Sequence, residues 1–400
     1  PWIKSVYGTY PLQGTQSYWS ISLANQGKRL TDGGMRIGFD DDTEYFDPLS
    51  RWALKTMMAV PSSVSKEQNM DHWRLKTCVY LLSASNLGLI SIWSPTYIIV
   101  LMEYIFNNIE TLLNELPHQR QQQIKQGISQ HGNTALALWP NLQLLTTWTD
   151  SVAAQFLPAL RCWFPHTPIQ GKGLLATEGV ISVPISSPQP GDINHYGECA
   201  VAISSHFMEF IDLNAPNKPP LLAHQLQKDG YYSPILTTSG GLYRYHLKDV
   251  VQCTGSYLRT PTIRFEGKLD RVSDVCGEKV HAQQIESALK QACAELNISY
   301  DFVMASPSIS TSPAGYRLYI DSNTSEQNLQ ALAQHVENYL LTGHHYRTCR
   351  NLNQLKALET QRVSNGWATY QRTLISGGQR NGDIKPTFLE TRYDWLNIFQ

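Results

Sequence analysis

Charged side chains are scarce in this chain of 400 residues, since only 16% are Asp, Glu, Lys or Arg where about a quarter is usual. The net charge is −1, and no run of Lys and Arg is longer than two or three residues. The sequence therefore lacks the electrostatic footprint that nucleic acid or an anionic membrane requires, and we expect neither partner. Trp and Tyr are plentiful, at 10 and 20 residues, which argues against disorder and predicts an aromatic-lined cavity.

Cysteines number seven, and no two of them stand at the spacing of a metal-ligand or redox motif. The odd number also argues against a complete disulfide framework, so a reducing, cytoplasmic setting fits best. The chain begins at Pro1 without Met and without a basic-then-apolar leader, so nothing suggests secretion. Pro1 suits a truncated start.

One apolar stretch, from Cys78 to Phe106, is long enough to span a membrane and carries no charge before Glu103. Polar and turn-forming residues interrupt it, among them Asn86 and Pro95. We therefore predict a turn over residues 85–88 between two shorter apolar elements, a buried strand and a buried helix.

Two familiar catalytic motifs are missing. The sequence contains neither a G-x-S-x-G elbow nor a G-x-x-x-x-G-K-[ST] phosphate loop, which disfavours a hydrolase and a P-loop enzyme. The neighbours His344 and His345 have no Cys, His or carboxylate at a convincing ligand spacing. We interpret them as solvated histidines at a helix end rather than as a metal site.

The length favours two domains, because one hydrophobic core seldom serves 400 residues. Up to residue 268, short β-rich runs alternate with helical patterns around 70–82, 97–115 and 149–163. This alternation predicts a large domain at 1–268 in which helices pack on a layered sheet.

From residue 269 to 400 the pattern predicts a smaller α+β domain. Two helical faces are apolar. The first consists of Ile285, Ala288, Leu289, Ala292, Cys293 and Leu296, and the second consists of Leu329, Leu332, Val336 and Leu340. A capping box at Thr324 and Gln327 would open the second helix, and 302–305 and 316–320 would form strands. The fold class is therefore α/β, with a large layered domain followed by a smaller α+β domain.

The tetrapeptide Ala176-Thr177-Glu178-Gly179 lies at a sharp break between two strand-like runs. Loops at strand ends commonly carry sites. A Thr hydroxyl there can bond a phosphate oxygen, a Glu can hold Mg²⁺, and a Gly lets the backbone approach a nucleotide. A plain turn explains the same residues, so the tetrapeptide alone leaves both interpretations open.

Two further side chains have a chemical and a structural interpretation. We expect Asp249 a few residues past the end of a strand pair, where its carboxylate can accept hydrogen bonds from the two hydroxyls of a ribose. Alternatively, Asp249 caps the element that follows it or pairs with Lys248. Lys385 lies in a Gly-rich segment, where it is either solvated or able to reach a phosphate that gains charge during a displacement.

Taken in order, four motifs resemble the Gretchen Hagen family, the auxin-responsive acyl acid amido synthetases of the adenylate-forming superfamily. They are Lys172-Gly173-Leu174-Leu175-Ala176-Thr177-Glu178-Gly179, His206-Phe207-Met208-Glu209-Phe210, Leu242-Tyr243-Arg244-Tyr245 with Asp249-Val250-Val251, and Phe265-Glu266-Gly267-Lys268-Leu269-Asp270. The resemblance is to the bacterial type of the family, and it runs along nearly the whole chain. The order of the motifs is specific, whereas each motif alone is weak.

The resemblance implies roles for the candidate residues. Residues 176–179 would line the nucleotide, with Thr177 and Glu178 at the α-phosphate and Glu178 at Mg²⁺. Asp249 would hold the ribose hydroxyls, and Lys268 would stand beside the nucleotide. Lys385 would be the mobile catalytic lysine.

Two departures from the family pattern stand out. Lys248 precedes Asp249 where the family commonly has Gly. Members of the family also carry a Ser/Thr/Gly-rich loop that cradles the β- and γ-phosphates, and residues 1–60 contain no such loop. The chain is therefore expected to be a fragment with a truncated large domain at 1–268, followed by a small mobile domain at 269–400.

The resemblance implies an ATP-dependent ligase. A carboxylic acid would be adenylated with ATP and Mg²⁺, and its acyl group would pass to an amine, with an amino acid as the expected acceptor. The small domain would turn about Leu269 and Asp270 between the steps. Acyl-CoA ligase-like thioester formation is the nearer alternative, because the same first step serves a thiol. A non-catalytic nucleotide-binding fragment is the alternative from another class.

Overall fold

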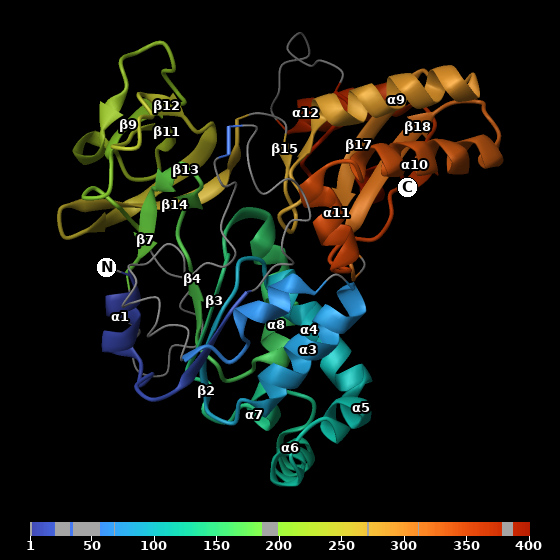
Figure 1. Cartoon of the computed structure of the whole chain (residues 1–400). Helices are drawn as coiled ribbons and strands as arrows, with labels where there is room; N and C mark the ends of the chain where they lie inside the picture. The colour runs from blue at the N-terminus through green and yellow to red at the C-terminus, as the bar shows by residue number, and fades with distance from the viewer. Residues whose placement is uncertain are drawn as a thin grey trace. The chain divides into compact units, whose positions relative to one another are not determined.

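The structure is a computed structural model that describes residues 2–20, 33–34, 57–67, 69–185, 199–269, 272–310, 312–377 and 387–400. It divides into two compact units, Pro1–Gly267 and Lys268–Gln400 (Figure 1). Lys385 and Asp270 lie outside the described residues.

The first unit contains a four-stranded parallel sheet with helices around it. Its strands follow the order of the chain: β1 (Gln16–Trp19), β2 (Leu87–Ser91), β3 (Leu144–Thr147) and β4 (Ile169–Gly171). The α-helices of this part are α1 (Trp2–Thr9), α3 (Met70–Ser83), α4 (Pro95–Asn107), α5 (Ile109–Asn114), α6 (His118–His131), α7 (Ala135–Leu138) and α8 (Leu157–Trp163). Short 3-10 helices are η2 (Ser62–Lys66) and η3 (Ser151–Phe156).

The apolar stretch at Cys78–Phe106 folds as predicted into separate buried elements. Every residue of β2 is buried, as in a parallel strand covered on both faces, and α4 follows with Pro95 at its first turn. The turn is shorter than predicted, because Leu87 already belongs to β2. Among the described residues, no helix has the length and apolar character needed to cross a membrane.

A second, eight-stranded sheet completes the first unit. Its main path runs β10-β9-β11-β13-β14-β8-β7, and β12 pairs with β11. The strands are β7 (Ser182–Pro184), β8 (Cys199–Val201), β9 (Phe207–Asp212), β10 (Leu221–Leu222), β11 (Tyr231–Thr237), β12 (Tyr245–His246), β13 (Asp249–Tyr257) and β14 (Thr260–Lys268). The short 3-10 helix η4 (Ala223–Gln225) follows β10.

A separate two-stranded hairpin, β5 (Leu175–Ala176) and β6 (Gly179–Val180), leads toward this sheet. In the second sheet, β12 pairs antiparallel with the end of β11, and Gly241 in their connection has a φ of 102°. The strand β8 stops at Val201, and a turn follows.

The second unit is built on the three-stranded sheet β17 (Phe302–Ser308), β18 (Gly315–Asp321) and β19 (Glu359–Arg362). Its helices are α9 (Ala282–Leu296), α10 (Glu326–Leu340), α11 (His344–Asn351), α12 (Gly366–Ser376) and α13 (Trp395–Ile398), and β15 (Val272–Ser273) pairs with β16 (Val280–His281). The predicted capping box at Thr324 and Gln327 is wrong, since Ser325 is the N-cap of α10 and its Oγ accepts from Asn328 N at 3.2 Å.

Candidate functional site

Thr177 and Glu178 form the tip of the β5–β6 hairpin. Ala176 pairs with Gly179 across the hairpin, Thr177 is exposed, and Glu178 is half-buried. Leu174 and Ala176 pack against the apolar core of the eight-stranded sheet, so this sheet supports the hairpin. The predicted break between two strands is confirmed as a tight turn with a hydroxyl and a carboxylate at its end.

Gly179 brings the hairpin into contact with His206. A Cβ added to Gly179 would lie 2.7 Å from both Cδ2 and Nε2 of His206, which is closer than real Cβ contacts. The Ser205 hydroxyl also donates to the Val180 carbonyl at 2.8 Å. A side chain at Gly179 would displace the imidazole. The contact with His206 therefore explains why a glycine stands at this position, and the sequence did not indicate this explanation.

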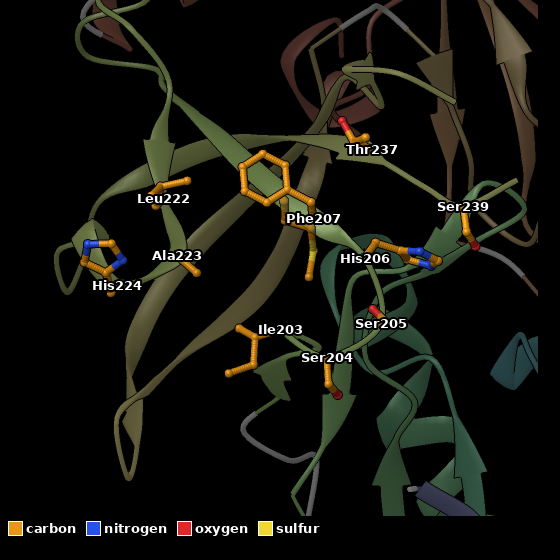
Figure 2. A pocket seen from close by; sticks show the side chains of 11 residues that line it. Ile203, Ser204, Ser205, His206, Phe207, Leu222, Ala223, His224, Thr237 and Ser239 are labelled. Carbon is orange, nitrogen blue, oxygen red and sulfur yellow. The ribbon is translucent and has the colours of Figure 1, made fainter. Parts of the chain in front are cut away.

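A cavity of about 530 Å³ adjoins the hairpin through His206 (Figure 2). This volume suits a small molecule. Its walls come from the segment before and within β9, from β10 and η4, and from the end of β11, and the lining residues are Ile203, Ser204, Ser205, His206, Phe207, Met208, Leu222, Ala223, His224, Thr237 and Ser239. These residues supply hydroxyl groups, two imidazoles and apolar surface, without a carboxylate, Lys or Arg among them.

Asp249 is the first residue of β13 and is only 3% exposed. It follows His246, the end of the β11–β12 pair, as predicted, and it opens a further strand. The Ser233 hydroxyl donates to the Asp249 carbonyl at 2.7 Å and lies 2.8 Å from His246 Nε2. Lys248 has a φ of 60°, a left-handed conformation that glycine adopts without strain.

Lys268 ends β14 and is exposed. The strand before it is tied to the start of η3, since Asp150 Oδ2 accepts from Phe265 N at 3.2 Å and the Ser151 hydroxyl donates to the Glu266 carbonyl at 3.0 Å. Burial raises the pKa of Asp150. The structure thus brings the hairpin tip, His206 and the cavity together, and Asp249 lies in the same eight-stranded sheet.

A buried cation, Lys172, lies at the carboxyl ends of the parallel strands. Lys172, directly after β4, is 6% exposed, and its Nζ donates to Ser91 Oγ at 2.7 Å at the end of β2. The same Nζ lies 4.9, 5.1 and 5.8 Å from the ring centroids of Trp93, Trp2 and Trp19. Open α/β sheets bind ligands at this edge.

The tryptophans of this cluster are held by contacts with one another. Trp2 and Trp19 meet edge to face at 5.9 Å, and Trp93 and Trp148 lie 6.0 Å apart. Composition predicted an aromatic-rich interior but not its location. The signal that could have located it is the position of Trp19, Trp93 and Trp148 at or just after strand ends.

Two cysteines far apart in the sequence meet in the second unit. Ligand atoms of Cys276, Glu278 and Cys349 all lie within 4.8 Å of one another and are buried, although the two cysteines are 73 residues apart. The prediction from spacing missed this pair, because spacing reports only neighbours along the chain. His344 and His345 begin α11 and are not part of this group.

Hydrogen bonds already occupy the Glu278 carboxylate. It accepts from the amides of Val275 and Cys276 at 2.7 and 2.8 Å and from the Tyr316 hydroxyl. Burial raises the pKa of Glu278 and of the Cys276 thiol. The group therefore acts as a structural anchor for the turn between β15 and β16.

The fold is that of the adenylate-forming enzymes. The structure resembles AtGH3.15 acyl acid amido synthetase in complex with 2,4-DB at a TM-score of 0.59 and 16% identity, over 100% of this chain and 75% of that chain. It also resembles a 2-hydroxyisobutyryl-CoA ligase in complex with 2-HIB-AMP and CoA, at a TM-score of 0.50 and 9% identity over 96% and 66% of the two chains.

Within this class the chain carries two domains of the GH3, or Gretchen Hagen, family. The GH3 family central domain matches residues 199–268, and the GH3 family C-terminal domain matches residues 283–392. The predicted family resemblance and mixed α/β adenylate-forming fold are thereby confirmed.

Two curated relatives illustrate the similarity. The 4-substituted benzoates-glutamate ligase GH3.12 of Arabidopsis thaliana is 25% identical over 205 residues, which are 49% of this chain and 34% of the relative. The GH3 domain-containing protein of Mus musculus is 27% identical over 191 residues, 46% and 35% of the two chains. The chain thus matches these relatives over about a third of their length.

Proposed function

We propose that the protein containing this chain is an ATP-dependent acyl acid amido synthetase, an enzyme that joins a carboxylic acid to an amine through an acyl adenylate. The observation that carries the proposal is the presence of GH3 central and C-terminal domains on an adenylate-forming fold. Relatives named as amido synthetases and as a benzoates-glutamate ligase support a small carboxylic acid and an amino acid as substrates.

In the first step the acid attacks the α-phosphorus of ATP and pyrophosphate leaves. The Thr177 hydroxyl binds an α-phosphate oxygen at the hairpin tip, and Asp249 holds the ribose hydroxyls. Lys268 stands beside the nucleotide, and Lys385 neutralises charge that builds on the phosphate. Ala176 and Gly179 supply the backbone that approaches the nucleotide.

Glu178 fits a magnesium ion. Its carboxylate is half-buried at the hairpin tip, and no salt bridge or hydrogen bond engages it in the described part of the chain. An oxygen ligand of this kind suits Mg²⁺, which supplies charge neutralisation for the phosphates when it is bound.

In the second step an amine attacks the acyl carbon and AMP leaves. The two compact units, with a hinge at Leu269 and Asp270, would rearrange between the steps, as we propose from the family resemblance. All seven cysteines are free thiols, which supports a cytoplasmic setting.

The test is pyrophosphate release by the complete protein with Mg-ATP, screened over panels of acids and amines, with product masses. An acid-dependent release and an amide mass support the proposal. A thioester mass with coenzyme A would instead support the second candidate, which the likeness to the CoA ligase fold favours. Absence of release with every acid would contradict both and favour a nucleotide-binding role.

A further inference from the structure

We infer that His206 accepts a proton from the amine that attacks the acyl adenylate, and is a catalytic residue of the amide-forming step. The inference rests on the proposed function, because an acyl adenylate must form first. His206 lies in one of the motifs that resemble the family, but the resemblance implied no role for it.

The position of His206 links the hairpin to the cavity. Its ring contacts Gly179, one residue beyond Glu178, and the same side chain lines the cavity of about 530 Å³. In Figure 2 the ring points toward the segment that carries Ser239, and His224 lies on the opposite side. A group beside the residues that hold the α-phosphate is close to the carbon that the amine attacks.

The imidazole of His206 is available to accept a proton. The side chain is partly buried, and in the ranges that the structure describes no hydrogen bond engages either ring nitrogen. Histidine is the usual general base near neutral pH, because its ordinary pKa lies close to that pH.

The cavity favours an uncharged amine. An ammonium ion has no lone pair and cannot attack, and a carboxylate in the wall would hold the amine in that form. The described lining residues contain no carboxylate, whereas Ser204, Ser205, Thr237 and Ser239 offer neutral hydroxyls.

The charged and titratable groups on the elements around His206 are few. Glu209 in β9 pairs with Arg244, whose Nε lies 2.9 Å from Glu209 Oε2. The remaining groups are Asp212 at the end of β9, Glu178 at the hairpin tip, Tyr231 and Tyr232 in β11, His224 in η4, and Tyr245 and His246 in β12.

The step balances as follows. His206 takes one proton from the ammonium, and the freed lone pair of nitrogen attacks the acyl carbon. The C–N bond forms, the bond from that carbon to the phosphate oxygen breaks, and AMP leaves with its electron pair. The second proton on nitrogen passes to water, which yields the neutral amide.

Hydroxylamine separates this role from a structural one. It is largely unprotonated at neutral pH, so it attacks an acyl adenylate without first losing a proton. The variants are His206→Ala and His206→Gln, and the matched control is His131→Ala, at the exposed last residue of α6. The complete protein is assayed with Mg-ATP and the acid that releases pyrophosphate fastest.

With an equimolar mixture of the standard amino acids as acceptor, both His206 variants should form amide on the order of a hundredfold more slowly than wild type. Hydroxamate formation should stay within about twofold, and amide formation by the variants should recover as the pH rises, because the free amine becomes more abundant. Added imidazole should partly restore the rate of His206→Ala. The His131→Ala control should match wild type with both acceptors.

Equal losses of hydroxamate and amide would overturn the inference, because they indicate a structural role at Gly179. Unchanged amide formation in both variants would overturn it as well. If wild type neither releases pyrophosphate nor forms hydroxamate with any acid, the proposed function fails and the inference with it, an outcome distinguishable from a loss confined to the variants.

Discussion

The Tyr346 hydroxyl donates a 2.7 Å hydrogen bond to Glu337 Oε2, and this bond joins α11 to α10 inside the second unit. Glu337 is 5% exposed at its side chain, yet it also accepts from Arg350 Nε at 2.6 Å and from the amide of Leu358 at 2.9 Å. A buried carboxylate with three donors connects two helices and the segment before β19.

Removal of Glu337 should therefore destabilise the second unit. Glu337→Ala leaves Arg350 without its buried partner, and we expect a loss of about 3–5 kcal/mol of unfolding free energy. Glu326→Ala is the control, because Glu326 is 74% exposed in its pair with Arg362 and should contribute about 1 kcal/mol or less. Urea unfolding measures both, and equal small losses would contradict the role of Glu337.

Glu278 should make stability depend on pH. Burial raises its pKa, so the folded state favours the protonated carboxyl relative to the unfolded chain. The stabilisation that the protonated Glu278 carboxyl gives to the folded state is fully present below the ordinary Glu pKa. It is lost as the pH rises through the raised pKa of the folded state. We expect wild type to gain stability relative to Glu278→Gln when the pH falls from neutral toward the ordinary Glu range.

The measurement is urea unfolding of wild type and Glu278→Gln at pH 7 and at mildly acidic pH. Titrating groups that do not interact with Glu278 are shared, so their effects cancel in the difference between the two proteins. The titration of Asp274, whose charge helps to raise the pKa of Glu278, contributes to the measured difference. A difference that is constant with pH, or that grows toward neutral pH in favour of wild type, would show that the carboxyl is not shifted upward.

Asp249 should contribute strongly to nucleotide affinity. If its carboxylate holds both ribose hydroxyls, Asp249→Ala loses roughly 2 to 4 kcal/mol of AMP binding, the value of charge-assisted hydrogen bonds. Calorimetric titration with AMP and with a dideoxyribose analogue separates the contact from a folding defect. Equal affinity of wild type for the two nucleotides would refute this role.

Lys385 should act on the rate of adenylation more than on ATP affinity. A preorganised charge donor is worth on the order of a hundredfold or more, so Lys385→Ala should slow single-turnover adenylate formation by that factor. Lys290→Ala is the matched control, because Lys290 lies on α9 in an exposed pair with Glu286. If Lys385→Ala forms the adenylate at the wild-type rate, Lys385 has no part in the mechanism.

Local patterns along the sequence determined the helices and strands well. The apolar periodicity at 70–82 corresponds to α3, and the two apolar faces of the second unit correspond to α9 and α10. The pattern at 97–115 missed a break at Asn108, whose amide side chain donates to the Tyr104 carbonyl at 2.9 Å and ends α4. Hydrophobic periodicity does not detect such a side-chain bond.

The order of motifs by itself indicated the family resemblance, and the alternation of strand and helix patterns indicated the α/β fold class, because both consist of short runs of neighbouring residues whose types are visible in the chain. Tertiary structure alone decided that His206 contacts Gly179, that Lys172 lies among tryptophans, and that Cys276 meets Cys349. These contacts join segments that are distant in sequence. Strand pairing and burial bring them together, and neither composition nor spacing encodes the register of those pairings.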